Sequence, residues 1–212
     1  MLDMDGVLCD YDYWLDYNDA RNEKGRTNWK KLLQIGSAFW ANMPWKVDGH
    51  KLYTMLLSYI AKHPEIEIGI HSAVGMDCGK IGKRYWLEKN CPEIPEENIK
   101  LDNDGHYKFM TGVEDEILVD DRQENVDKYI EFGFPAVLFT TPEETFFNIV
   151  KLCKQKNKMG KDTISLNATC ANCSTTWQTS GTLNERRSTL INVVQNTCPK
   201  CDNWKKNIFF IN

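Results

Sequence analysis

Two carboxylates stand at the start of the chain, where Asp3 and Asp5 follow two apolar residues and precede Gly6. On a strand, side chains two residues apart point the same way, so both carboxylates would reach one reacting atom. In that arrangement Asp3 is suited to attack phosphorus and form an aspartyl-phosphate, while Asp5 is suited to protonate the leaving oxygen and later to activate water. Gly6 would let the chain turn tightly past the site. Taken alone, the pair could equally be an acidic turn on the surface.

Two further apolar runs end in polar residues that suit the same chemistry. Residues 66–71 lead to Ser72, and residues 117–119 lead to Asp120 and Asp121. Short apolar runs bounded by polar residues are typical of buried parallel strands. Because ligands of open α/β sheets bind beyond the carboxyl ends of the strands, these side chains and the Asp3–Asp5 pair should share one edge. Together they predict a Mg²⁺-dependent phosphoryl-transfer site.

The elements that must position this site alternate between strand and helix, which predicts an α/β fold with a parallel sheet and helices on both faces. After an N-terminal strand we expect strands at 66–71, 116–120 and 136–139, and helices at 51–62, 79–90, 124–132 and 143–154. Residues 11–60 are rich in aromatic side chains and show helical spacing in pieces. We interpret them as a small helical cap inserted after the first strand. An ordinary helical layer on the sheet is the alternative.

Several separated motifs resemble one family of phosphohydrolases and occur in that family's order. They are DMDGVLCDY at 3–11, Phe39-Trp40, the HSA turn at 71–73, KRYWLEK at 83–89, Lys108, and ILVDDR at 117–122. Over roughly residues 1–140 the chain therefore resembles the haloacid dehalogenase (HAD) superfamily and, within it, the 5′(3′)-deoxyribonucleotidases. The resemblance implies a HAD-like Rossmannoid sheet with a small helical cap, Mg²⁺ as cofactor, and hydrolysis of (deoxy)nucleoside monophosphates.

The expected magnesium ligands are Asp3, one acid of the pair Asp120 and Asp121, and the backbone carbonyl of Asp5, because hard cations take oxygen ligands. By resemblance, Asp121 is the direct ligand and Asp120 the supporting one. The spacing of the sequence does not decide between them, and one of the two could cap the next helix instead.

The resemblance also assigns residues around the substrate. Ser72 would donate a hydrogen bond to a phosphate oxygen, with a plain turn residue as the alternative. Lys108 is the best match to the lysine that neutralises the phosphoryl charge, with Lys80 and Lys83 as alternatives. Lys83 matches a lysine that binds the substrate phosphate, although an exposed helical lysine fits the same pattern. His71 could contact the substrate or be a packed histidine.

A wall of aromatic side chains on which a base could stack is the last part of this resemblance. It comprises Tyr11, Phe39 and Trp40. Aromatic faces suit a base and tolerate several of them. Packing within the core of the cap is the alternative for these residues.

Four of the eight cysteines form two CxxC pairs, Cys170 with Cys173 and Cys198 with Cys201, with 24 residues between the pairs. This spacing predicts a structural Zn²⁺ held by four thiolates. Two disulfides are the alternative, which CxxC pairs in a chain without a visible signal peptide do not favour. A module of this size buries little core, so the metal would supply much of its folding energy.

The net charge of the chain also changes sign before the segment that holds the CxxC pairs. Residues 1–150 hold 16 Lys and Arg against 27 Asp and Glu, a net charge of −11, whereas residues 151–212 hold 10 against 3, a net charge of +7. We expect a phosphatase domain at 1–153, a polar linker at 154–162 and a zinc-ribbon-like module at 163–212. With no membrane-length apolar stretch and no visible signal peptide, we expect a cytoplasmic protein.

Two other functions are open. The first is a polynucleotide end-phosphatase in which the basic zinc module binds nucleic acid through lysine and arginine at 151–161, 186–187 and 200–206, with Trp177 or Trp204 stacking on a base. The second is a binding protein whose HAD domain is vestigial. The presence of all four acids argues against the second, because a dead site has no need of them.

Overall fold

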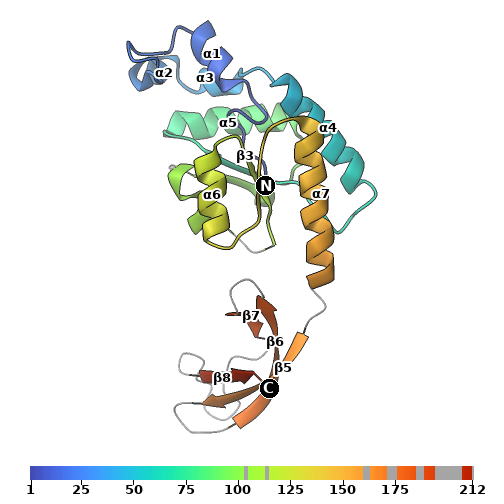
Figure 1. The fold of residues 1–212 in the computed structure, drawn as a ribbon. Coiled ribbons are helices and arrows are strands. Elements are labelled where there is room, and N and C mark those ends of the chain that lie inside the picture. The colour runs from blue at the N-terminus through green and yellow to red at the C-terminus, as the bar shows by residue number, and fades with distance from the viewer. Residues whose placement is uncertain are drawn as a thin grey trace. The chain divides into compact units, whose positions relative to one another are not determined.

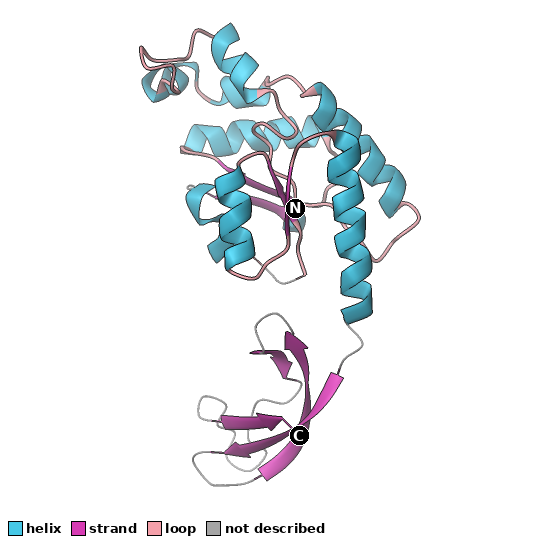
Figure 2. Cartoon of the chain, viewed as in Figure 1, coloured by secondary structure: helices cyan, strands magenta, loops and turns pink. Residues whose placement is uncertain are grey.

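The computed structural model describes residues 1–102, 105–112, 115–159, 163–170, 176–184, 189–193 and 207–211. The chain divides into two compact units, Met1–Leu152 and Cys153–Asn212 (Figure 1). Helices and strands mix in the first unit, and the part of the second unit after its helical start is described as strands (Figure 2).

Parallel strands form the centre of the first unit. They are β1 (Ile70–Ala73), β2 (Ile99–Asp102), β3 (Leu118–Asp120) and β4 (Ala136–Leu138). β1 pairs in parallel with β2, and β3 pairs in parallel with β4. The N-terminal segment joins the two pairs, because Leu2 forms parallel bridges to Ile70 on one side and to Val119 on the other. The order across the strands is therefore β2, β1, residues 1–3, β3, β4.

This order places a topological switch point at the N-terminal segment, since the chain runs outward through β1 and β2 on one side and through β3 and β4 on the other. Crevices beyond the carboxyl ends of the strands at such a point are where open α/β sheets bind ligands. The mixed α/β architecture expected from the sequence is confirmed. The first strand is short, because the bridges of the N-terminal segment to β1 and β3 involve Leu2 alone.

Helices surround these strands. The larger ones are α4 (Val47–Ile60), α5 (Asp77–Asn90), α6 (Gln123–Glu131) and α7 (Pro142–Met159), and two 3₁₀ turns are η1 (Glu96–Asn98) and η2 (Gly105–Met110). Three short helices lie at one end of the unit, beyond α5 (Figure 1). They are α1 (Tyr11–Tyr17), α2 (Trp29–Ile35) and α3 (Ser37–Ala41).

The short helices are fixed to the rest of the unit by close packing of α3 on α5. A Cβ atom at Gly82 of α5 would lie 2.3 Å from the carbonyl oxygen of Ser37, so this crossing requires glycine. Trp40 of α3 is 2% exposed, and the indole nitrogen of Trp86 donates to the carbonyl of Met43 at 2.7 Å. The region therefore sits on α5 through buried aromatic contacts.

The last helix of the first unit extends further than the sequence suggests. The helix expected over 143–154 continues to Met159, so residues 154–159, expected to begin a linker, are helical. Lysine and glutamine are good helix formers, and a polar composition alone does not end a helix. The other expected linker residues, 160–162, lie outside the described residues.

The second unit contains an antiparallel sheet with the order β7, β6, β5, β8. Its strands are β5 (Thr163–Cys170), β6 (Thr176–Asn184), β7 (Thr189–Val193) and β8 (Asn207–Ile211). Cys170, the last residue of β5, pairs with Asn207, the first residue of β8. The other three expected zinc ligands, Cys173, Cys198 and Cys201, lie outside the described residues. Among the helices that the structure describes, none has the length and apolar character needed to cross a membrane.

Candidate functional site

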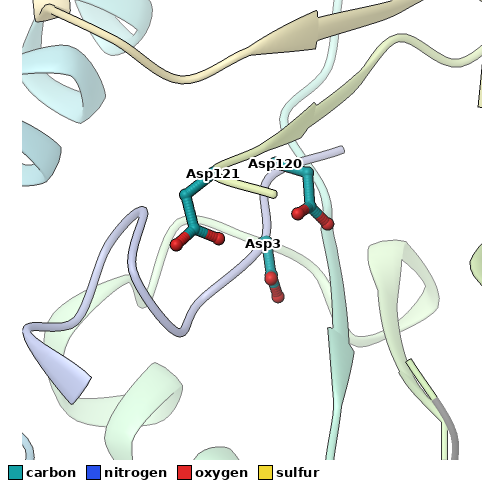
Figure 3. Close-up of side chains that lie close together, drawn as sticks. All are labelled: Asp3, Asp120 and Asp121. Atoms are coloured by element: carbon teal, nitrogen blue, oxygen red, sulfur yellow. The ribbon is translucent and has the colours of Figure 1, made fainter. Parts of the chain in front are cut away.

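Three carboxylates meet at the carboxyl ends of the central strands. Asp3 follows the bridge residue Leu2, Asp120 ends β3, and Asp121 comes next (Figure 3). One oxygen from each lies within 4.8 Å of the others. These acids come from the N-terminal segment and from the end of the adjacent strand β3, so the sheet topology brings them together from positions more than 100 residues apart in the chain.

The carboxylate of Asp120 is buried and fully engaged by neighbouring groups. Its Oδ1 accepts from the backbone N–H of Arg122 at 3.0 Å, and the side-chain amide of Asn125 lies 3.0 Å from both of its oxygens. Its Oδ2 also accepts from Lys108 at 2.7 Å. Both oxygens of Asp120 are therefore occupied by hydrogen bonds that hold Lys108, Arg122 and Asn125 in place.

Asp121 has a different environment. Its side chain is exposed on one side and lies against the backbone of Gly6 on the other, where a Cβ atom would stand 2.0 Å from Oδ2. Gly6 has a φ of +79°, a conformation that glycine adopts without strain. Partial burial, with Asp3 and Asp120 nearby, raises the pKa of Asp121 to about 6. Of the two adjacent acids, Asp121 has the carboxylate with room for a ligand.

Lys108 lies between the nucleophile candidate and the supporting acid. Its side chain is buried, with Nζ 2.9 Å from Oδ2 of Asp3 and 2.7 Å from Oδ2 of Asp120. Burial alone would lower the pKa of Lys108, but the two carboxylates outweigh it and the pKa is raised. Lys108 is therefore a fixed positive charge beside Asp3.

A second buried lysine donates a hydrogen bond to Asp5. Lys83 is fully buried, and its Nζ donates to Oδ2 of Asp5 at 2.8 Å, to Oγ of Ser72 at 2.9 Å and to the carbonyl of Ala73 at 2.5 Å. The three protons of the ammonium are thus used within the protein. Oδ1 of Asp5 is buried and has no hydrogen-bond partner among the described residues.

The pKa values of Asp3 and Asp5 are displaced in opposite directions. Burial would raise the pKa of Asp3, but Lys108, then Lys83, and hydrogen bonds from Ser72 and Lys108 lower it overall. Burial raises the pKa of Asp5, and the charge of Asp3 adds to this while Lys83 opposes it. Paired carboxyl groups whose environments separate their pKa values are a common arrangement for acid–base chemistry.

A cavity of about 520 Å³ opens above these acids. Its lining combines charged and polar groups with the aromatic side chains of Tyr11, Trp29 and Trp40. The lining residues are Asp3, Asp5, Gly6, Tyr11, Asp12, Thr27, Trp29, Trp40, Ala73, Val74, Gly75, Lys108, Asp121, Arg122 and Asn125. The volume lies within the roughly 300–1,000 Å³ typical of small-molecule sites.

The residues expected from the sequence divide into two groups. Asp3, Asp5, Lys108, Asp121, Tyr11 and Trp40 line the cavity, whereas Asp120, Ser72, Lys83, Phe39 and His71 are buried and are not among the lining residues. Ser72 and Lys83 still reach the site, because they contact each other and Lys83 contacts Asp5.

Two of the expected substrate contacts occupy packed positions instead. The ring of Phe39 is 1% exposed and meets Tyr11 and Trp40 edge-on, with centroids 6.0 and 5.2 Å away. His71 is fully buried, and its Nε2 lies 2.8 Å from Oδ2 of Asp102. The packing alternatives that the sequence leaves open fit both residues.

Several cavity residues were not anticipated, notably Trp29, Gly75, Arg122 and Asn125. The signal for Trp29 is local, because Asn28 accepts from the backbone N–H of Lys31 at 3.2 Å and so caps a helix that begins with Trp29. The position of Asn125 on the first turns of α6 follows from the strand–helix junction after Asp120. Neither pattern says which side chains face a cavity, since that depends on tertiary packing.

Comparison with known proteins adds no assignment. No model of a known protein family matches the sequence, and no curated protein matches it. The chemistry of the chain is therefore inferred from its own residues and their geometry.

Proposed function

We propose that this protein is a Mg²⁺-dependent phosphomonoesterase of the HAD type that acts through an aspartyl-phosphate on Asp3. The proposal rests mainly on one observation: each of the two neighbouring acids, Asp3 and Asp5, contacts a different buried lysine. Lys108 contacts Asp3 at 2.9 Å and Lys83 contacts Asp5 at 2.8 Å, with the pKa of Asp3 lowered and that of Asp5 raised. One acid is thereby suited to attack and the other to carry a proton.

The reaction has two steps. In the first, a carboxylate oxygen of Asp3 bonds to phosphorus and the bond from phosphorus to the leaving oxygen breaks, while Asp5 gives its proton to that oxygen. In the second, Asp5 takes a proton from a water molecule, whose oxygen attacks phosphorus and releases phosphate and the Asp3 carboxylate. Asp5 lines the cavity and would hold this proton on its carboxyl group, whose Oδ2 accepts from Lys83.

The residues that would hold Mg²⁺ are Asp3, Asp121 and the backbone carbonyl of Asp5. The donors fit a hard cation, because oxygens of Asp3, Asp120 and Asp121 approach within 4.8 Å of one another and carboxylate oxygen is the ligand that Mg²⁺ prefers. Asp120 would support the site from behind, since its oxygens are already hydrogen bonded. A bound Mg²⁺ would offset the repulsion between the Asp3 carboxylate and a phosphate dianion.

We infer that the substrate is a nucleoside monophosphate. The cavity of about 520 Å³ offers Tyr11, Trp29 and Trp40 beyond the acids, and aromatic faces suit a planar base. Lys108 lines the same cavity and supplies positive charge beside Asp3 for the phosphoryl group.

A polynucleotide end-phosphatase is the second candidate, favoured by the net charge of +7 over residues 151–212. In that function a Cys170–Cys173–Cys198–Cys201 zinc site would stabilise the second unit, whose basic surface would bind a strand. The register of β5 with β8 is compatible with this zinc proposal, because it sets Cys170 opposite Asn207, six residues after Cys201.

The test is phosphate release with Mg²⁺ from 5′- and 3′-mononucleotides and from 5′- and 3′-phosphorylated oligonucleotides, with Asp3→Asn as the control. Faster turnover of mononucleotides supports the nucleotidase. Faster turnover of oligonucleotides, with binding that weakens steeply as salt rises, supports the second candidate. No Mg²⁺-dependent release from any substrate would overturn both.

A further inference from the structure

A polar cluster around one buried histidine lies at the side of the site, where β1 and β2 run out toward η2. His71 is fully buried, with Nε2 2.8 Å from Oδ2 of Asp102 and 3.2 Å from Oγ1 of Thr111. Oγ1 of Thr111 also lies 3.3 Å from the same oxygen of Asp102. Three polar side chains from three segments thus converge on one point.

Thr111 connects this cluster to the lysine beside Asp3. Its backbone N–H donates to the carbonyl of Lys108, and its hydroxyl lies 3.3 Å from that same carbonyl. From Lys108 the chain of contacts continues to Oδ2 of Asp3 at 2.9 Å and Oδ2 of Asp120 at 2.7 Å. Lys100 adds a further contact from β2, because its Nζ donates to the carbonyl of Thr111 at 3.3 Å.

Burying the imidazole of His71 costs free energy, because one of its two ring nitrogens has no hydrogen bond among the described residues. Its Nδ1 is buried and has no partner among the described residues. Buried polar atoms are nearly always hydrogen bonded, so a histidine with one idle nitrogen suggests a specific use for the other. Burial lowers the pKa of His71, which leaves a neutral ring whose Nε2–H is directed to Asp102.

We propose that His71, Asp102 and Thr111 form a positioning clamp that fixes Lys108 between Asp3 and Asp120. The catalytic part of this inference rests on the proposed function, while the structural part does not. The clamp acts through the backbone of η2 and never touches the substrate, since none of its three residues is among those that line the cavity. His71 is thus a positioning residue.

The first test measures the clamp without catalysis. The full-length protein is treated briefly with an amine-acetylating reagent, and modification of Lys108 is quantified by mass spectrometry. Lys108 is 3% exposed and should be protected in the wild type, with fully buried Lys83 as an internal reference. Thr111→Val and His71→Leu should increase modification of Lys108 about tenfold and leave Lys83 protected. In His71→Gln, the modification of Lys108 should stay close to that of the wild type, because the amide can replace the Nε2–H donor.

The second test uses turnover. Thr111→Val and His71→Leu should lower kcat about tenfold with little change in KM, as expected when one hydrogen bond that positions a charge is lost. In a Lys108→Met background the same changes should have no further effect on kcat, because the residue through which they act is gone. His63→Leu is the matched control, since His63 forms an exposed pair with Glu65 at 3.3 Å.

The outcomes separate the clamp from the proposed function. Unchanged protection of Lys108 in folded Thr111→Val and His71→Leu proteins would overturn the clamp, and so would effects on kcat that multiply with Lys108→Met. If His71→Leu does not fold, Thr111→Val at an exposed position carries the test. A wild type without phosphatase activity would refute the proposed function alone, because the labelling result would still decide whether the clamp exists.

Discussion

Replacing Gly6 by alanine should have two separate effects, one on the stability of the turn and one on the position of the Asp121 side chain. The φ of +79° at Gly6 makes any side chain strained, and an alanine Cβ would stand 2.0 Å from Oδ2 and 2.5 Å from Cγ of Asp121. The backbone strain should cost about 1–2 kcal/mol of unfolding free energy. The clash itself should cost little stability, because the exposed Asp121 side chain can swing away. That movement would remove the proposed magnesium ligand.

Gly25→Ala is the matched control for this substitution. Gly25 has a φ of +70°, and nothing lies within 4 Å of the position that a Cβ would take. It therefore carries the same backbone strain without a neighbour to displace. Without Mg²⁺, urea denaturation should give both variants a similar loss of about 1–2 kcal/mol.

The two variants should differ in their response to magnesium. For Gly6→Ala, the Mg²⁺ concentration for half-maximal phosphate release should rise about 10- to 100-fold, the range seen when a metal ligand loses its orientation. For Gly25→Ala it should equal that of the wild type. If Gly6→Ala kept the wild-type Mg²⁺ dependence, Asp121 would not be a ligand and the reasoning would fail. A much larger loss of stability in Gly6→Ala would show that Asp121 cannot move.

Three other predictions follow from the same contacts. Asp3→Asn should abolish phosphate release while circular dichroism and the melting temperature stay near wild type; substantial residual activity would contradict the nucleophile assignment. Lys83→Met should lower the unfolding free energy by about 1–3 kcal/mol in urea denaturation, because it removes the donor to Oδ2 of Asp5 and to Oγ of Ser72, and no measurable loss would contradict these contacts. Cys170→Ser should reduce the zinc content measured by atomic emission, and full zinc occupancy in this variant would rule out the four-thiolate site.

The sequence predicts best the elements that bury a continuous apolar face. Residues 117–119 form such a run, and β3 is found there with Leu118 and Val119 buried. β2 was not expected, because its second residue is Lys100, which breaks the apolar run of a buried strand. The charge is accommodated by Glu116, whose oxygens lie 2.7 and 2.8 Å from Nζ of Lys100. That partner is 16 residues away and invisible to a local pattern.

The candidate site shows the same limit for side chains. The spacing of Asp3 and Asp5 is a local feature and could be recognised without a structure. The partner of each acid could not, because Lys83 is 78 residues from Asp5 and Lys108 lies in a turn that no periodicity marks. The sequence also offers no reason to direct His71 toward Asp102, since both faces of a buried strand accept apolar neighbours.

The separate pairing of the two lysines explains how adjacent carboxyl groups could hold different protons. Two acids in equivalent surroundings would repel each other and share one proton, without a fixed assignment. Here Lys108 contacts Asp3 and Asp120 together, so one positive charge meets two negative ones and Asp3 remains ionised. Lys83 binds a single oxygen of Asp5 and divides its other protons between neutral acceptors, which leaves Oδ1 buried and unpaired. The different partners leave the pKa of Asp5 raised, chiefly by burial, and the pKa of Asp3 lowered, although the two residues are only two positions apart.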